Sequence, residues 1–217
     1  MRKLFALALA ASALSVPTTA FAKKDKSAQA APAPLAMKET GIAKIDETFA
    51  KAKAPLDTIS KVRTEVDGLT ANVASALGLT AGAPIADALA DLKAKAAGKL
   101  TLAMDGGKPK VSAADGVPDN VKAAIDALNA GIDNVKNAVA ALSEVPAQLT
   151  AVADDAKQYS DPAVLQGLVG DNPAAVMKAP KAIAQNLETL TKAPEEAKAV
   201  ALSADNLIKT VTTTLAN

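Results

Sequence analysis

Acidic side chains are the main candidates for chemistry in this chain, because it contains no cysteine and no histidine. Two adjacent pairs, Asp154-Asp155 and Glu195-Glu196, stand out, since paired carboxylates can serve acid–base catalysis or bind Ca²⁺. Single carboxylates also occur at Asp115, Asp119 and Asp171. Neighbouring helical residues point about 100° apart, so the members of each pair do not converge. No acidic run has the spacing of an EF-hand loop, and we expect solvated charge and no metal ligand.

Nucleophilic catalysis has equally little support. A serine–lysine dyad needs a serine three residues before a lysine, and the nearest approach, Thr58-Ile59-Ser60-Lys61, has a threonine there. Without cysteine and histidine there is no thiolate, no Ser-His-Asp relay and no usual zinc, haem or iron–sulfur ligand. No glycine-rich phosphate loop with its lysine occurs. The sequence predicts that the protein is not an enzyme, with no catalytic, cofactor-binding or metal residue and no cofactor.

Nucleic-acid binding is also disfavoured. The aromatic residues are Phe5, Phe21, Phe49 and Tyr159, and the arginines are Arg2 and Arg63. Nucleic-acid recognition relies on basic patches, forked guanidinium groups and stacking rings, and all three are scarce here. Tyr159 follows Val152 by seven residues and is predicted to lie at the edge of the core.

Residues 1–22 are predicted to be a secretory signal. Arg2 and Lys3 precede an apolar run from Leu4 to Val16, and Ala20 and Ala22 supply small residues before a cleavage site. The run is shorter than the ~20 residues of a membrane span, and no cysteine follows it for a lipoprotein anchor. Cleavage after Ala22 would place the protein in the periplasm or outside the cell. Residues 23–37 are polar and Ala/Pro-rich, which predicts a disordered leader.

The remaining residues, 38–217, are predicted to form a single helical-bundle domain. Alanine is the strongest helix former, and β-branched or aromatic clusters are scarce. One long helix is expected over 38–79, with apolar residues spaced three and four apart, and a shorter one over 84–98. Two further long helices are expected from Pro118 to about residue 160 and from Pro173 to about Leu215, with a short helix over 162–169 between them. Asp171 or Asn172 would cap the last of these.

The second and third long helices carry apolar residues at seven-residue intervals, as coiled coils do. In the second helix the two series are Val121, Leu128, Val135, Leu142, Leu149 and Ala156, and Ile125, Ile132, Val139, Pro146 and Ala153. In the third they are Val176, Ile183, Leu190, Ala197, Ala204 and Val211, and Pro180, Leu187, Pro194, Ala201, Ile208 and Leu215. Each helix has one apolar stripe and must bury it against the others. We therefore predict an all-α, elongated antiparallel bundle in which small alanines allow close approach.

Two features interrupt this helical pattern. Residues 99–113 contain partial alternation around Asp105-Gly106-Gly107, which predicts either a β-hairpin or an irregular connector. Pro55, Pro146, Pro180 and Pro194 lie within otherwise helical stretches, and a proline there removes one backbone hydrogen bond. Each long helix is therefore expected to be bent or interrupted at its prolines.

Three functions remain open on this sequence. The leading hypothesis is an exported structural, scaffold or chaperone-like protein that binds a protein partner or itself. The second is a carrier of lipid or another apolar ligand, with amphipathic proline-broken helices that contact a membrane surface. The third is a component of an α-helical pore-forming toxin with the hairpin as its tongue, although residues 99–113 carry Lys99, Lys108, Lys110 and Asp105.

Overall fold

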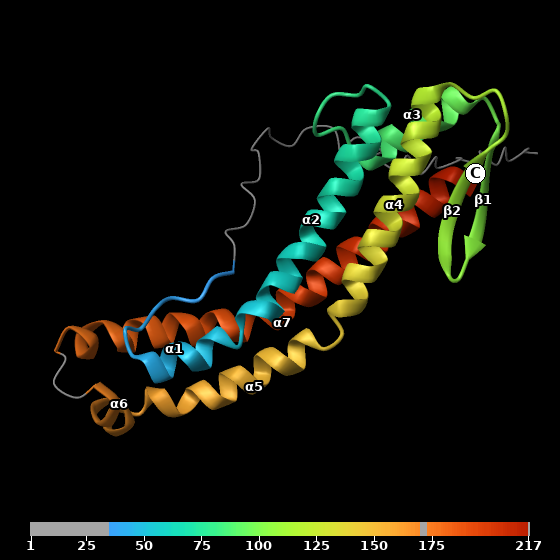
Figure 1. Ribbon diagram of the computed structural model, residues 1–217. Coiled ribbons are helices and arrows are strands. Elements are labelled where there is room, and N and C mark those ends of the chain that lie inside the picture. The colour runs from blue at the N-terminus through green and yellow to red at the C-terminus, as the bar shows by residue number, and fades with distance from the viewer. Residues whose placement is uncertain (1–34, 170–172, 217) are drawn as a thin grey trace, which may run out of the picture. The chain divides into compact units, whose positions relative to one another are not determined.

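The computed structural model describes residues 35–169 and 173–216. The predicted signal peptide, most of the leader, and Asp171 and Asn172 lie outside these ranges. The described chain is mostly helical with one two-stranded antiparallel sheet, which confirms the all-α bundle with a hairpin insertion. Figure 1 shows the elements. In chain order they are α1 (Ala43–Ala50), α2 (Lys53–Ala76), α3 (Ile85–Ala96), β1 (Leu100–Asp105), β2 (Lys108–Ala113), α4 (Asp119–Ala141), α5 (Val145–Lys157), a 3-10 turn (Gln158–Ser160), α6 (Pro162–Val169) and α7 (Pro173–Ala216).

The helix predicted over 38–79 is two helices. It begins late, at Ala43, because Asp46 bonds the backbone N–H groups of Thr40 and Gly41 and holds that segment outside the helix. It breaks at Lys51 and Ala52, where α1 ends and α2 begins. Pro55 lies in the first turn of α2, where the missing N–H costs little.

The helix predicted from Pro118 to residue 160 is divided in the same way. Pro146 is near the start of α5, and residues 142–144 separate that helix from α4. Pro146 has no N–H for the carbonyl of Leu142, which instead accepts the N–H of Val145 at 3.2 Å. The prediction of an interruption at a proline is confirmed at Pro55 and Pro146.

The third long helix is confirmed as one element, because α7 runs through Pro180 and Pro194 without a break. Figure 1 shows it changing direction near its middle, close to the α1–α2 and α4–α5 corners. Leu56, Leu142 and Ala193, near these corners, are all buried in the first core cluster. All three runs of the bundle therefore change direction together.

The buried side chains form two clusters along the bundle. The first lies around α1, the start of α2, α5 and the first part of α7, and the second around α3, α4, the end of α2 and the end of α7. The first heptad series of α4 and α5 is buried at every position: Val121, Leu128, Val135, Leu142, Leu149 and Ala156. The second series is buried at Ile125 and Ile132 and half-buried at Val139, Pro146 and Ala153.

A glycine sets the closest approach between α2 and α4. A Cβ built on Gly131 would lie 2.7 Å from Cγ of Leu69, inside van der Waals contact. Leu69 and Leu128 are both buried at this crossing. The alanines predicted to allow close packing behave similarly in α7, where Ala197 and Ala204 are buried and Ala201 is half-buried.

The insertion at 99–113 is a β-hairpin. Leu100 pairs with Ala113, Leu102 with Val111 and Asp105 with Lys108 in an antiparallel register. Its two-residue turn uses Gly106 and Gly107 at φ +56° and +78°. Positive φ at both central positions matches the right-handed twist of the strands and strongly favours glycine. The irregular-connector alternative was wrong.

Candidate functional site

The paired carboxylates point to different cations. Asp154 contacts Lys157 at 2.7 Å, whereas Asp155 contacts Lys51, between α1 and α2, at 3.6 Å. The members of the second pair also separate. Glu195 lies 3.6 Å from Lys198 on its own helix, and Glu196 pairs with Arg63 on α2. The expected divergence of neighbouring residues is confirmed, and each carboxylate is part of an ion pair.

Other candidate reactive groups also lack a converging partner. The Thr58 hydroxyl donates to the backbone oxygen of Ala54 at 2.9 Å, as threonines within helices commonly do. Tyr159 is more deeply placed than predicted, since only 3% of it is exposed and its hydroxyl lies 3.1 Å from that of Thr48. Over the described residues there is no group of three acidic side chains able to hold a metal ion.

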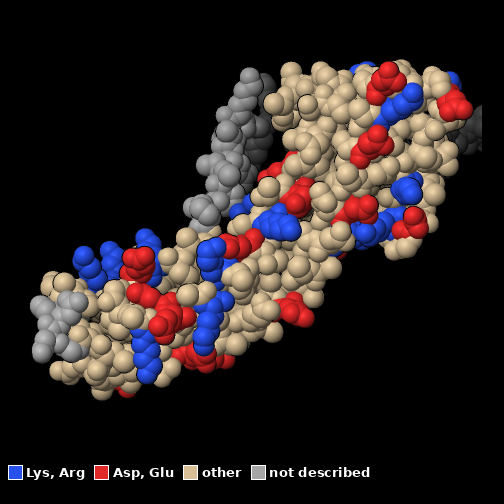
Figure 2. Space-filling view, viewed as in Figure 1, with Lys and Arg blue, Asp and Glu red and all other residues tan. Residues whose placement is uncertain are grey.

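One carboxyl group has a shifted pKa, and the cause is local. Lys192 donates a 2.5 Å hydrogen bond to Glu188 one turn earlier on α7, which lowers the pKa of Glu188. Both side chains are exposed. Active sites shift pKa values through burial or convergent charges, whereas this shift arises from an ordinary surface pair. On the face shown in Figure 2, acidic and basic side chains are interspersed along the bundle.

An ion pair and an amide side chain attach the hairpin to α4. Lys108 of β2 lies 2.9 Å from Asp133 of α4, and Asn129 bonds the backbone of β2. Asn129 accepts the N–H of Val111 at 2.9 Å and donates to the backbone oxygen of Val111 at 2.8 Å. Its amide therefore replaces a neighbouring strand for that residue of β2. Asn186 on α7 makes the same pair of bonds to a different segment. It accepts the N–H of Lys38 at 2.7 Å and donates to the Lys38 oxygen at 2.8 Å. Sequence reasoning missed both residues, and the only available signal was an amide beside an apolar stripe.

Because Asn129 takes both backbone groups of Val111, these groups must point away from β1. In an antiparallel pair the backbone groups alternate between facing the partner and facing away. Leu102, opposite Val111, therefore presents its N–H and oxygen on the open edge of β1, as do Leu100 and Met104. The hydrogen bond from the Ala114 N–H to the Lys99 oxygen agrees with this assignment. It means that the odd-numbered residues of β1 direct their backbone groups toward β2, so the even-numbered ones face away.

The two edges of the hairpin are therefore unequal. On β2 the outward edge contains Pro109, which has no N–H to leave unpaired, Val111, which Asn129 satisfies, and Ala113 at the end of the strand. On β1 the structure gives Leu102 and Met104 no hydrogen-bond partner on the outward edge, within the residues it describes. Figure 1 shows β2 between α4 and β1, and β1 in turn contacts α7.

The side chains beside this open edge are apolar. Met104 is 63% exposed, and Leu102 is half-buried against the second core cluster. No charged residue or proline occurs between Leu100 and Met104, whereas β2 begins with Lys108, Pro109 and Lys110. Natural proteins usually protect an exposed edge strand with charges or proline, because it readily pairs with another strand. The open edge of β1 lacks this protection and is the candidate binding site.

A second candidate site is a groove beside the N-terminal segment. It has a volume of about 470 Å³ and lies between residues 35–39 and the α1–α2 corner. Its apolar lining includes Leu35, Met37, Phe49 and Leu56, and its rim carries the Lys53–Asp57 ion pair at 2.5 Å. Pockets of this size commonly hold small apolar ligands oriented by a few polar groups.

The chain was compared with protein families, curated proteins and solved structures. No protein-family model, curated protein or solved structure matches the chain. A search of the described helices finds none long and apolar enough to cross a bilayer.

Proposed function

We propose that this protein is an exported, non-enzymatic helical bundle that acts as a structural, scaffold or chaperone-like binding module in the periplasm or outside the cell. The observation that carries the proposal is the open edge of β1, beside the exposed Met104, on a hairpin whose other edge is closed. Such an edge binds an extended polypeptide by strand addition, in which backbone hydrogen bonds supply affinity and side-chain contacts supply specificity.

The rest of the molecule supports a binding role by fixing the hairpin. Asn129 holds β2 on α4, and Leu100 and Leu102 pack against the second core cluster. The edge is therefore presented in one orientation by a rigid support, which reduces the entropy cost of binding. The acidic pairs also favour binding over catalysis, because each of their carboxylates is held in a separate ion pair and none converges on another.

Photo-cross-linking in the native cell envelope tests this proposal. A photoreactive amino acid at Met104 should form cross-links to a polypeptide, and the same group at Leu202 should not. The two positions are matched controls, since Met104 is 63% exposed and Leu202 62%. Equal cross-linking at both positions, or none at Met104, would contradict a binding site at β1.

Intact mass of the native protein checks the export step, and we expect a chain that begins at Lys23.

The groove beside residues 35–39 favours a second function, that of a carrier for lipid or another apolar ligand. Phe49 and Leu56 form its floor, and both are buried. Co-flotation of the mature chain with liposomes distinguishes the two functions, because a scaffold should stay in the unbound fraction. A toxin component would in addition release dye from the liposomes, and the lysines of the hairpin disfavour that outcome.

A further inference from the structure

We propose that the strand paired with the open edge of β1 is β1 of a second copy of this chain. The inference rests on the proposed function and names its partner. Residues 99–105 read Lys-Leu-Thr-Leu-Ala-Met-Asp. When two such strands run antiparallel about a two-fold axis at Leu102, residue 100 faces residue 104 of the second copy, and residue 99 faces residue 105.

The backbone fits this register. Leu100, Leu102 and Met104 all present their N–H and oxygen on the open edge, and the two-fold arrangement sets these residues opposite one another. Leu102 pairs with Leu102, and each Leu100 pairs with Met104 of the other copy. Residues that face each other with outward backbone groups exchange both N–H and oxygen bonds. The two hairpins thus form one four-stranded antiparallel sheet.

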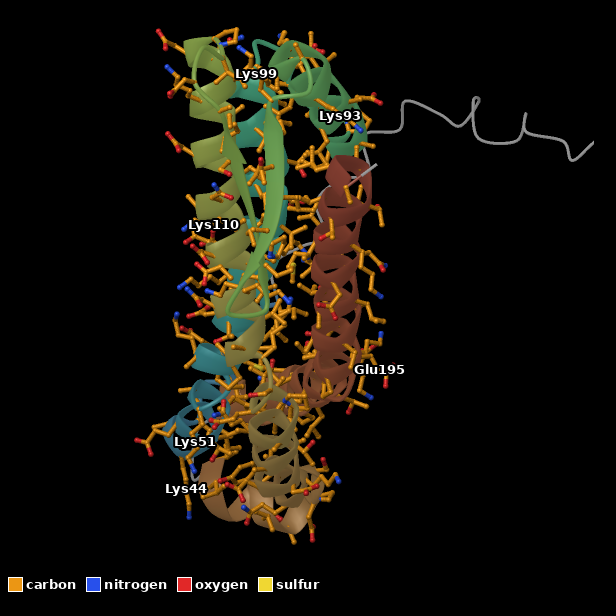
Figure 3. The ribbon with its side chains drawn as sticks, turned by 90° about the vertical axis from the view of Figure 1, so that its right-hand side faces the viewer. Lys44, Lys51, Lys93, Lys99, Lys110 and Glu195 are labelled. Atoms are coloured by element: carbon orange, nitrogen blue, oxygen red, sulfur yellow. The ribbon has the colours of Figure 1, made fainter. Side chains whose placement is uncertain are left out.

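The side chains fit it as well. Leu100, Leu102 and Met104 alternate onto one face of β1, so the pairing joins two apolar stripes and covers the exposed Met104. On the opposite face the register places Lys99 next to Asp105 of the second copy, twice by symmetry. Both side chains are exposed, and both exchange a surface partner for the new pair. The Lys99 amine leaves the backbone oxygens of Asp115 and Gly116, at 3.3 and 3.4 Å, and Asp105 leaves Lys110, at 3.7 Å. Figure 3 shows Lys99 at one end of the hairpin.

The closed edge of β2 explains why pairing would stop at two copies. Edge-to-edge pairing propagates into fibres when each chain offers two open edges. Here Pro109 and the Asn129 amide block two of the three outward positions of β2, only Ala113 at the strand end is left, and the first partner occupies the edge of β1. A symmetric pair in which the same surface meets itself is also the commonest form of oligomer.

The charge pairing can be tested by reversal and mixing. Sedimentation of the mature chain over a range of concentrations should show a monomer–dimer equilibrium. Lys99→Asp and Asp105→Lys each place like charges opposite one another, and each should raise the Kd by about tenfold or more. An equimolar mixture of the two variants restores both opposite-charge pairs, so dimers should return. Lys122→Asp, an equal charge change on α4, should leave the Kd unchanged.

A second pair of variants tests the backbone contact. Leu102→Pro removes an N–H that points at the partner and leaves the β1–β2 ladder intact. It should abolish the dimer, whereas Leu102→Ala keeps the N–H and should retain it. A chain that stays monomeric at all concentrations, or a dimer indifferent to Leu102→Pro and to charge reversal, would overturn the proposal. If the chain is monomeric but Met104 cross-links to a different protein, the binding function survives and the second copy does not.

Discussion

Asn129 is the residue on which the hairpin depends most directly. Its amide is the donor and the acceptor for Val111, and no aliphatic side chain can replace both bonds. We expect Asn129→Ala to lower the free energy of unfolding by about 1–3 kcal/mol, because two partly buried backbone groups lose their partner. The N–H of Val111 should also lose its protection from hydrogen exchange.

Asn134 provides the control for that substitution. It lies on the same helix and is exposed, and the structure gives its side-chain amide no hydrogen bond within the described residues. Asn134→Ala should therefore change stability by no more than about 0.5 kcal/mol. Urea melts and amide exchange of the two variants make the comparison, and similar behaviour would show that the Asn129 amide does not hold the hairpin.

A single buried side chain at the α4–α5 corner offers another test. Leu142 is 5% exposed and ends α4 within the first core cluster. Leu142→Ala should cost about 2–5 kcal/mol, because the surrounding leucine and valine side chains collapse only partly around the cavity. Asn137→Ala, at an exposed position of α4, should cost no more than about 0.5 kcal/mol in the same urea melts. Equal costs would mean that the stripe is not buried in solution.

Between elements, glycine substitutions separate helix propensity from helix packing. Gly131 and Gly68 both lie inside helices, but only Gly131 meets a neighbour, the Leu69 side chain of α2. Gly68→Ala should stabilise the protein by up to about 1 kcal/mol through helix propensity alone. Gly131→Ala gains the same propensity but forces Leu69 or the helix to move, and we expect a net loss of about 1–2 kcal/mol.

Thermal and urea melts of the two glycine variants check this difference in sign. A stabilising Gly131→Ala would show that α2 and α4 have room to separate at their crossing. Wild-type levels of far-ultraviolet circular dichroism would confirm in either case that the helices themselves remain formed.

The whole bundle should unfold as one unit although its core has two clusters. Helices α2, α4 and α7 each contribute to both clusters, so neither cluster can lose its helices without disturbing the other. Tyr159 is the one tyrosine of the chain, which lacks tryptophan, and it lies in the first cluster. Its fluorescence therefore reports on that cluster, while circular dichroism reports on all helices. The two urea transitions should coincide, and separate midpoints would reveal independent clusters.

At the scale of the molecule, the seven-residue series were enough to predict the bundle. Leu128, Val135 and Leu149 were predicted to be buried from spacing alone, and they are. Periodicity succeeds here because burial of one stripe is the main requirement of each helix. The hairpin was predictable as an alternative because Gly106-Gly107 permits a turn that few other residues allow.

The consequences of the prolines depended on tertiary packing. All four prolines remove one backbone bond, yet Pro55 and Pro146 begin new helices whereas Pro180 and Pro194 lie within α7. The local sequence does not distinguish them, since Pro55, Pro180 and Pro194 each end the same Lys-Ala-Pro triplet. The surroundings differ, because α7 packs against α5, α2 and α3 along its length. We infer that these contacts keep it one continuous helix through both prolines.

The sequence by itself determined that the chain is mostly helical, which stripe is buried and the absence of histidine and cysteine chemistry, because these depend on residue type and spacing along one chain. Only the tertiary structure decided which edge of the hairpin stays open. That choice follows from Asn129 meeting Val111, 18 positions away in sequence, and from β2 rather than β1 lying against α4. Hydrogen bonding between distant backbone and side-chain groups leaves no periodic signal, so the candidate site became visible only in the folded chain.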